Sequence, residues 1–185
     1  MTVKGPDIAE IRALYGALLE GVIRTPVVRC AALEALIGGG TTVTAKLEFL
    51  QRTGTFKARG ALATLRSLSA EELEAGVTAV SAGNHAIATA FAAQTMRTTA
   101  KVVMIRAANP ARVAACRAYG AEVVLADDVH EAFDIAGEIQ QGEGRYFVHP
   151  FEGRGVALGT GTLGLEICEQ VEAFDTLVVP IGGGG

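Results

Sequence analysis

One lysine, Lys57, stands between a glycine-containing turn at Gly54 and the start of a helical pattern. The positive end of a helix dipole disfavours a protonated amine, and a neighbouring ring such as that of Phe56 shields the amine from water. Both effects lower the pKa of a lysine, so that its free amine can attack a carbonyl and form a Schiff base. The sequence therefore predicts a nucleophilic lysine at residue 57. The alternative is an ordinary solvated lysine in the first turn of a surface helix.

A second segment whose residue types could bind a ligand is Ser81-Ala82-Gly83-Asn84-His85. It follows an apolar strand pattern and opens a helical one. Hydroxyl and amide side chains, together with backbone N–H groups at a helix start, suit an anion such as a carboxylate or a phenolate. Ser81 or Asn84 could equally be an ordinary helix cap, and His85 could be a helix residue with a satisfied hydrogen bond. The residue types leave both interpretations open.

The third segment is the run of glycines Gly182, Gly183, Gly184 and Gly185, which follows an apolar strand pattern at 176–179. Backbone N–H groups of such a run can surround a phosphate, because no Cβ atoms interfere. A flexible tail is the other interpretation. For a phosphate loop, we expect a helix beyond residue 185 whose first N–H groups complete the anion site.

The elements that must position these segments alternate between strands and helices. The helical patterns cover 7–19, 31–37, 56–68, 84–94, 110–119, 129–141 and 162–171, with a short helix opening at Ser69. The strand patterns cover 42–47, 77–80, 101–105, 122–125, 147–148 and 176–179, with extended chain at 25–28. This alternation predicts an α/β fold with a parallel sheet, right-handed crossovers and helices on both faces. In such sheets, ligands bind at the carboxyl ends of the strands, where 81–85 and 182–185 fall.

Composition narrows the class of protein. The chain has 185 residues, half of them hydrophobic, which is enough for a buried core and for one domain or slightly more. No apolar run approaches the roughly 20 residues that span a bilayer, and residues 1–5 lack a secretory signal, so we expect a cytoplasmic protein without a membrane partner. The net charge of −4 is small and the basic residues are scattered, which argues against a nucleic-acid partner.

The cysteines and histidines do not indicate a metal site or a disulfide framework. Cys30, Cys116 and Cys168 are far apart and lack C-x-x-C spacing, so we expect each to fill a small apolar site in a reducing compartment. His130 and His149 have no metal-ligand spacing. We therefore predict no metal.

Taken together, the three segments resemble the fold-type II pyridoxal-phosphate enzymes, in the threonine/serine dehydratase branch that also contains serine racemase. Lys57 falls where that family's T-G-S-F-K-x-R-G motif places its Schiff-base lysine, with Thr55 in the serine position. Residues 81–85 match its S-A-G-N-H loop, and residues 179–185 match its phosphate-binding loop. Two further segments also look like parts of that family: 118–125 and 147–151. The resemblance covers nearly the whole chain.

The resemblance implies pyridoxal 5′-phosphate as the cofactor, with Lys57 binding it and later taking the Cα proton of the substrate. Phe56 would pack against the pyridine ring, Asn84 would hydrogen-bond the phenolic oxygen, and Gly182 to Gly185 would hold the phosphate. The groups around the substrate carboxylate would be Ser81, Gly83, Asn84 and His85. The implied substrate is L-threonine, L-serine or another 3-hydroxy amino acid, and the products are a 2-oxo acid and ammonia.

The resemblance also implies a two-domain architecture in which the larger domain is incomplete. Residues 1–70 would belong to the large domain, 71–147 would form the small domain, and 148–185 would return to the large one. Family members continue well beyond the glycine loop, with a polar partner for the pyridine nitrogen and, in some members, a divalent-cation site. Family likeness further favours a homodimer for the full-length protein.

The sequence departs from the family pattern at several positions. Ala82 stands where serine racemases carry a second serine that acts as the opposite-face acid and base, so we expect elimination rather than racemisation. Changes at Ile87, Ala88, Thr160 and Arg106 leave the substrate open among threonine, serine and 3-hydroxy-aspartate. Another alternative is a catalytically silent fragment that binds an amino acid or anion, although binding alone has no need of Lys57. A carbon–sulfur or synthase member of the same fold type fits the lysine motif less well.

Overall fold

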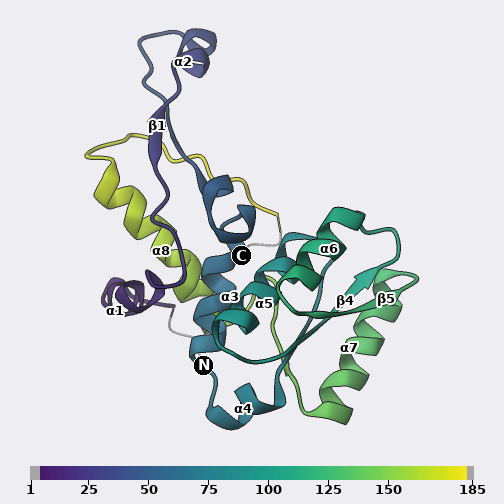
Figure 1. Cartoon of the computed structure of the whole chain (residues 1–185). Helices are drawn as coiled ribbons and strands as arrows, with labels where there is room; N and C mark the ends of the chain where they lie inside the picture. The colour runs from purple at the N-terminus through teal and green to yellow at the C-terminus, as the bar shows by residue number, and fades with distance from the viewer. Residues whose placement is uncertain (1–4, 183–185) are drawn as a thin grey trace.

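The predicted parallel sheet is present in the computed structural model, which describes residues 5–182 (Figure 1). Its strands are β3 (Val77–Val80), β4 (Ala100–Ile105), β5 (Glu122–Ala126) and β6 (Tyr146–Phe147), in the order β5-β4-β3-β6. All neighbouring pairs are parallel. The connecting helices are α5 (Asn84–Thr95), α6 (Pro110–Ala118) and α7 (Val129–Glu143). Because the strands are parallel, their carboxyl ends and the loops that follow them lie at one edge of the sheet.

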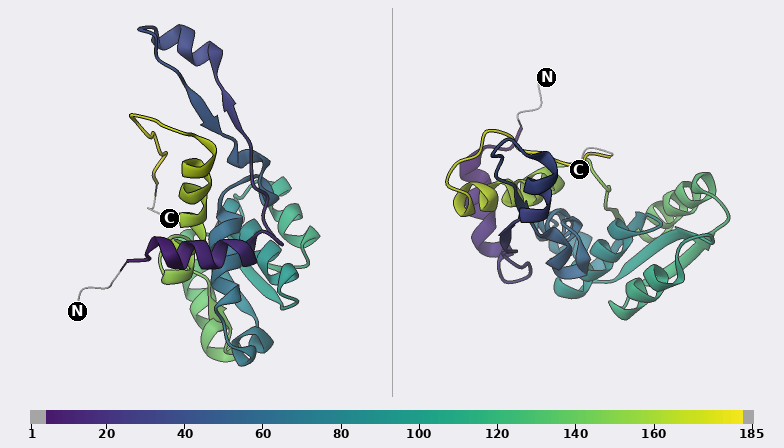
Figure 2. Two further views of the ribbon diagram at one scale, coloured as in Figure 1. Left: turned by 90° about the vertical axis from the view of Figure 1, so that its left-hand side faces the viewer. Right: turned by 90° about the horizontal axis from the view of Figure 1, so that it is seen from above.

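Helices cover both faces of this sheet. Val102 and Met104 of β4 belong to a core that also contains residues of α5 and α6, whereas Val103 between them packs with Ala132 and Ala136 of α7. Successive side chains of a strand point to opposite faces, so one apolar run supplies both cores. The right-hand view of Figure 2 shows α6 and α7 on opposite sides of the sheet. The α/β fold with helices on both faces is confirmed.

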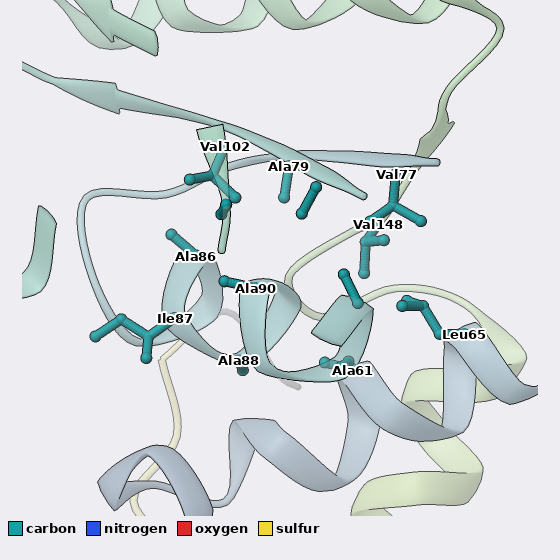
Figure 3. Close-up of a cluster of buried hydrophobic side chains, with 14 of the residues drawn as sticks. Ala61, Leu65, Val77, Ala79, Ala86, Ile87, Ala88, Ala90, Val102 and Val148 are labelled. Atoms are coloured by element: carbon teal, nitrogen blue, oxygen red, sulfur yellow. The ribbon is translucent and has the colours of Figure 1, made fainter. Parts of the chain in front are cut away.

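A helical layer, formed by α1 (Ile8–Leu18), α3 (Lys57–Arg66) and α8 (Arg154–Gln170), lies on the far side of α5 from the sheet. Figure 3 shows α5 between the strands and α3, with Ala86 and Ala90 on the side of Ala79 and Val102. The short helix α4 (Ala70–Ala75) links α3 to β3 and begins with a capping box at Ser69. The small residues on α5 allow both neighbours to approach it closely.

The helix α8 begins at Arg154, whereas the sequence pattern predicted its start near Thr162. Glycines in this stretch suggested a loop, but two of them serve close packing against α3. A Cβ at Gly159 would lie 2.4 Å from the carbonyl oxygen of Arg59, and one at Gly155 would lie 2.7 Å from Thr64 Cα. The predicted start was wrong because tertiary packing stabilises this helix despite its glycines.

A protruding unit, residues 27–46, extends away from the sheet (Figure 1). The antiparallel strands β1 (Val27–Arg29) and β2 (Thr44–Lys46) carry α2 (Ala31–Ile37) at the tip. Gly38, with φ of 71°, ends α2, whose bounds match the helical pattern predicted at 31–37. Two short 3₁₀ turns, η1 (Glu48–Leu50) and η2 (Arg52–Gly54), then lead into α3.

The strand predicted at 176–179 is absent from the structure. Within 171–182 the chain forms no helix or strand, and Val178 is 86% exposed. An apolar, β-branched run becomes a strand only when another strand supplies hydrogen bonds, and none of the described strands pairs with it. Periodicity alone could not supply this information.

The cysteine prediction is confirmed in one case and wrong in another. Cys116 is buried beside Met104, with 3.9 Å between the two sulfur atoms, and burial raises the pKa of its thiol to about 11. Cys168 is exposed on α8, so it does not fill an apolar site. In the described part of the chain the cysteines are unpaired.

Among the described helices, none is both long and apolar enough to cross a membrane.

Candidate active site

Lys57 is the first residue of α3, at the place the sequence predicted. The turn before it contains two consecutive residues with left-handed backbone, Thr53 with φ of 67° and Gly54 with φ of 72°. A threonine in this conformation is strained, which is common at functional sites. The hydroxyl of Thr55 then accepts a hydrogen bond of 3.3 Å from the backbone N–H of Lys57. This turn directs the chain into α3 with the lysine at its start.

The amine of Lys57 is partly withdrawn from water. Its Nζ donates a hydrogen bond of 2.5 Å to the carbonyl oxygen of Pro150 and lies 5.1 Å from the centre of the Phe56 ring. Burial lowers the pKa of the amine below its ordinary value, in the direction predicted from the sequence. The protein therefore holds an amine that loses its proton more readily than a surface lysine does.

A buried charge network, formed by Arg59, Glu166, Glu48 and Lys46, anchors α3 just after Lys57. The Arg59 guanidinium, fully buried, donates to Glu166 at 2.8 and 3.0 Å and to Glu48 at 2.8 and 2.9 Å. Lys46, the last residue of β2, forms an ion pair with Glu166 of α8. Two cations and two anions balance, so the network joins α3, α8, β2 and η1 without net charge. Sequence reasoning missed this network, because its members are far apart in the chain.

The loop 81–85 leaves the carboxyl end of β3 and opens α5, as predicted. Ser81 Oγ accepts a hydrogen bond of 3.1 Å from the Gly83 N–H, and Gly83 itself is the N-cap, with no side chain capping the helix. The interpretation of Ser81 or Asn84 as the helix cap is therefore wrong. Among the described residues, no side chain caps the first N–H groups of α5, and exposed Asn84 lies at the helix start, so the loop can accommodate an anion.

His85 is buried and neutral. Its Nε2 lies 2.8 Å from the carbonyl oxygen of Val148 and must donate, because a carbonyl can only accept. The pKa of the ring is lowered to about 4, mainly by burial, with smaller contributions from the nearby charges of Lys57 and His149. His85 therefore supplies structure to the loop but no positive charge at neutral pH.

The segment 148–150, which follows β6, brings the two predicted segments together. The carbonyl of Val148 holds His85, and the carbonyl of Pro150 holds Lys57. His149 between them accepts an N–H of Glu152 at its Nδ1, at 2.8 Å. Sequence reasoning gave this segment no role, because backbone carbonyls act here and any residue type carries one.

A second residue that the sequence did not single out is Arg112, in the first turn of α6. Its guanidinium lies directly against Gly83, since a Cβ at Gly83 would be 2.4 Å from Arg112 Nη1. The glycine thus allows the arginine to reach the loop. An exposed arginine on an amphipathic helix carries no signal in the sequence that distinguishes it from its neighbours.

The predicted phosphate loop is not assembled among the described residues. Gly182 is exposed, and a Cβ added to it would meet no atom within 4 Å. Gly183, Gly184 and Gly185 lie outside the described residues. The cofactor-binding role of the four glycines stays a prediction.

A half-buried lysine held by the segment after β6, beside an open helix start at the carboxyl edge of a parallel sheet, is an arrangement suited to an enzyme whose lysine reacts with a bound carbonyl group. The family model of the pyridoxal-phosphate dependent enzymes matches residues 18–185, and the chain belongs to this family. The cofactor of the family is pyridoxal phosphate.

The relatives that the chain resembles include dehydratases and a serine racemase. It is 53% identical over 180 residues to a phenylserine dehydratase of Ralstonia pickettii, covering 97% of this chain and 55% of the relative. It is 41% identical over 179 residues to an L-threonine ammonia-lyase of Thermotoga maritima, covering 96% of this chain and 44% of the relative. The structure of maize serine racemase superposes with a TM-score of 0.92 at 33% identity, covering 98% of this chain and 55% of that one. The chain thus spans about half the length of the relatives it matches.

Proposed function

We propose that the full-length protein is a pyridoxal-phosphate dependent dehydratase that converts a 3-hydroxy amino acid into a 2-oxo acid and ammonia. The observation that carries this proposal is the half-buried amine of Lys57, with its lowered pKa, held by the segment that also holds the loop 81–85. A protein that only binds an anion has no need of such an amine. This argues against the catalytically silent alternative.

The residue types near Lys57 and Asn84 suit the cofactor. Lys57 offers an amine whose pKa is lowered by burial, and the Phe56 ring beside it offers an apolar surface for a pyridine ring. Asn84 is exposed at the start of α5, and its amide would hydrogen-bond the phenolic oxygen. Gly182 to Gly185 would hold the phosphate. When bound, the cofactor draws electrons away from the substrate Cα.

The residues of this chain would then bind, orient and deprotonate the substrate. The loop residues Ser81, Gly83, Asn84 and His85 would hold the substrate carboxylate and so orient the Cα–H bond toward Lys57. The Lys57 amine would take the Cα proton, and the carbonyl of Pro150 would position that amine. The Cβ–O bond would then break, and the proton taken up by Lys57 would leave with the hydroxyl as water. Hydrolysis of the resulting imine gives the 2-oxo acid and ammonia.

The substrate is proposed at the level of 3-hydroxy amino acids. Threonine, serine and 3-hydroxy-aspartate are candidates from the sequence, and the 53% identical relative adds phenylserine by its name. A panel of these four amino acids, assayed for 2-oxo acid release, ranks them by kcat/KM.

The test of the proposed function is borohydride reduction of the full-length protein with its cofactor, followed by peptide mapping. We expect the cofactor to be fixed on Lys57 and lost in Lys57→Ala. Lys101→Ala is the matched control, because Lys101 is paired with Glu143 at the surface. A label on another lysine, or no label at all, contradicts the proposal.

Racemisation is the activity that Ala82 argues against. Ala82 has no hydroxyl and lies exposed in the loop, so residue 82 cannot return a proton to the opposite face of Cα. We expect no appreciable D-serine from L-serine. Chiral chromatography of the reaction mixture measures this, and D-serine at a rate comparable to 2-oxo acid release would refute it.

We also propose two properties that rest on family resemblance: the division into 1–70 and 148–185 as one domain and 71–147 as another, and a homodimeric full-length protein. The cytoplasmic location expected from the sequence stays a proposal too.

A further inference from the structure

The loop 81–85 offers a carboxylate only neutral groups. Ser81 and Asn84 carry no charge, and His85 is neutral because burial lowers the pKa of its ring to about 4 while its Nε2 donates to the Val148 carbonyl. The amine of Lys57 is occupied by the Pro150 carbonyl and by its proposed chemical role. Hydrogen bonds to a carboxylate from a charged donor are about twice as strong as those from neutral donors. The loop as it stands lacks such a donor.

Arg112 lies where a charged donor would complete this loop. Its Nη1 and Cζ would be 2.4 and 3.1 Å from a Cβ at Gly83, so the guanidinium covers the middle of the loop. The helix α6 begins after β4, and therefore at the same edge of the sheet as the loop. Arg112, Ala82 and Asn84 are all exposed.

The guanidinium of Arg112 has no protein partner within residues 5–182. It makes no hydrogen bond or ion pair there, whereas Arg106, near the same edge, pairs with Asp127 at 2.5 Å. A guanidinium presents its N–H groups in a planar fork that matches a carboxylate. An arginine that is unpaired and lies against an anion-binding loop is available for a ligand.

We propose that Arg112 determines specificity by binding the α-carboxylate of the substrate together with the loop 81–85. This inference rests on the proposed function, which assigns the carboxylate to that loop. It adds a requirement on the substrate: the enzyme selects amino acids with a free carboxylate over their amides. The contribution of Arg112 weakens as salt rises, because the guanidinium is exposed.

The experiment uses the full-length protein with its cofactor and compares two unreactive ligands by calorimetry. L-Alanine has a carboxylate but no β-hydroxyl to eliminate. L-Alaninamide keeps the α-amine but has a neutral amide in place of the carboxylate. We expect Arg112→Met to weaken L-alanine binding by about 10- to 100-fold and to leave L-alaninamide unchanged. Arg112→Lys should recover part of the loss, because it keeps the charge but not the fork. For the reacting substrate, KM should rise more than kcat falls.

The matched control is Arg117→Met, at the other end of the same helix and also exposed. It should leave both dissociation constants unchanged. An unchanged affinity for L-alanine in Arg112→Met, or an equal loss for both ligands, would overturn the inference, as would an unmodified protein that does not prefer L-alanine. Borohydride labelling of Lys57, measured in parallel, reports on the proposed function alone. If Lys57 is labelled but L-alanine binds equally well with and without Arg112, only the role of Arg112 is overturned.

Discussion

At the scale of single residues, burial sets the charge of the candidate site. Lys57 and His85 are ordinary basic residues in the sequence, yet burial lowers the pKa of each. The consequence is an amine that loses its proton more easily and an imidazole that stays neutral. The two residues therefore have different roles: Lys57 is suited to react, and His85 supports the loop.

The neutral state of His85 makes stability depend on pH. The folded pKa of about 4 lies below the ordinary value of about 6.5, so between these values the unfolded chain binds a proton that the folded chain does not. The free energy of unfolding should therefore fall as pH drops from 6.5 to 4, by about 3 kcal/mol from this residue. Urea unfolding at a series of pH values measures the slope. His85→Gln should flatten it.

His130→Gln is the control for this prediction, because the His130 side chain is 91% exposed. Its pH dependence should follow that of the unmodified protein. A His85→Gln variant with the same slope as the unmodified protein would show that His85 takes up its proton equally in both states.

At the scale of elements, the contact between α3 and α8 holds Lys57 in place. The two helices approach so closely that Gly155 and Gly159 of α8 face the backbone of α3. Beside this contact, Arg59 of α3 pairs with Glu166 of α8. Close packing and buried charge thus act on the same pair of helices.

Gly159→Ala tests the close packing. The added Cβ would lie 2.4 Å from the Arg59 carbonyl oxygen and 2.7 Å from Ala63 Cβ, so the helices must separate, and we expect a loss of about 1–3 kcal/mol in the free energy of unfolding. Gly164→Ala in the same helix meets no atom within 4 Å and should stabilise by about 0.5–1 kcal/mol. Chemical denaturation compares the two. Equal effects would contradict the role of Gly159.

Arg59→Met tests the buried charges. It leaves Glu166 and Glu48 without their main cation, and we expect a loss of about 3–5 kcal/mol. Arg106→Met removes an ion pair whose side chains are 64% and 74% exposed, and it should cost less than about 1 kcal/mol. Thermal and urea unfolding measure both. A small effect of Arg59→Met would mean that water or rearranged side chains replace its hydrogen bonds.

At the scale of the whole molecule, order should decrease from the sheet to the protruding unit. The strands β3 and β4 have neighbours on both sides, whereas α2 has no buried residue and stands on two strands of three residues each. Few buried contacts mean easy local opening. Amide hydrogen exchange followed by mass spectrometry should show fast exchange in 31–37 and slow exchange in 77–80 and 100–105. Similar protection in these segments would contradict this gradient.

The accuracy of the predicted element bounds differs along the described chain. In the segment 77–126, strands and helices alternate with clear start and stop signals, and each element was predicted within a residue or so of its bounds. The start of α8 and the strand at 176–179 were predicted wrongly, because each depends on a partner. Glycines are tolerated in α8 where α3 packs against them, and an apolar run stays irregular where no strand pairs with it.

By itself, the sequence determined the α/β class, the family, and the positions of Lys57 and of the loop 81–85, because local patterns encode helix starts, strand runs and motif spacing. Only the tertiary structure decided how these parts meet. It showed that the carbonyls of Val148 and Pro150 hold His85 and Lys57, that Arg59 is buried between two carboxylates, and that Arg112 lies on Gly83. The physical reason is that burial, desolvation and contacts between distant segments arise only when the chain is folded.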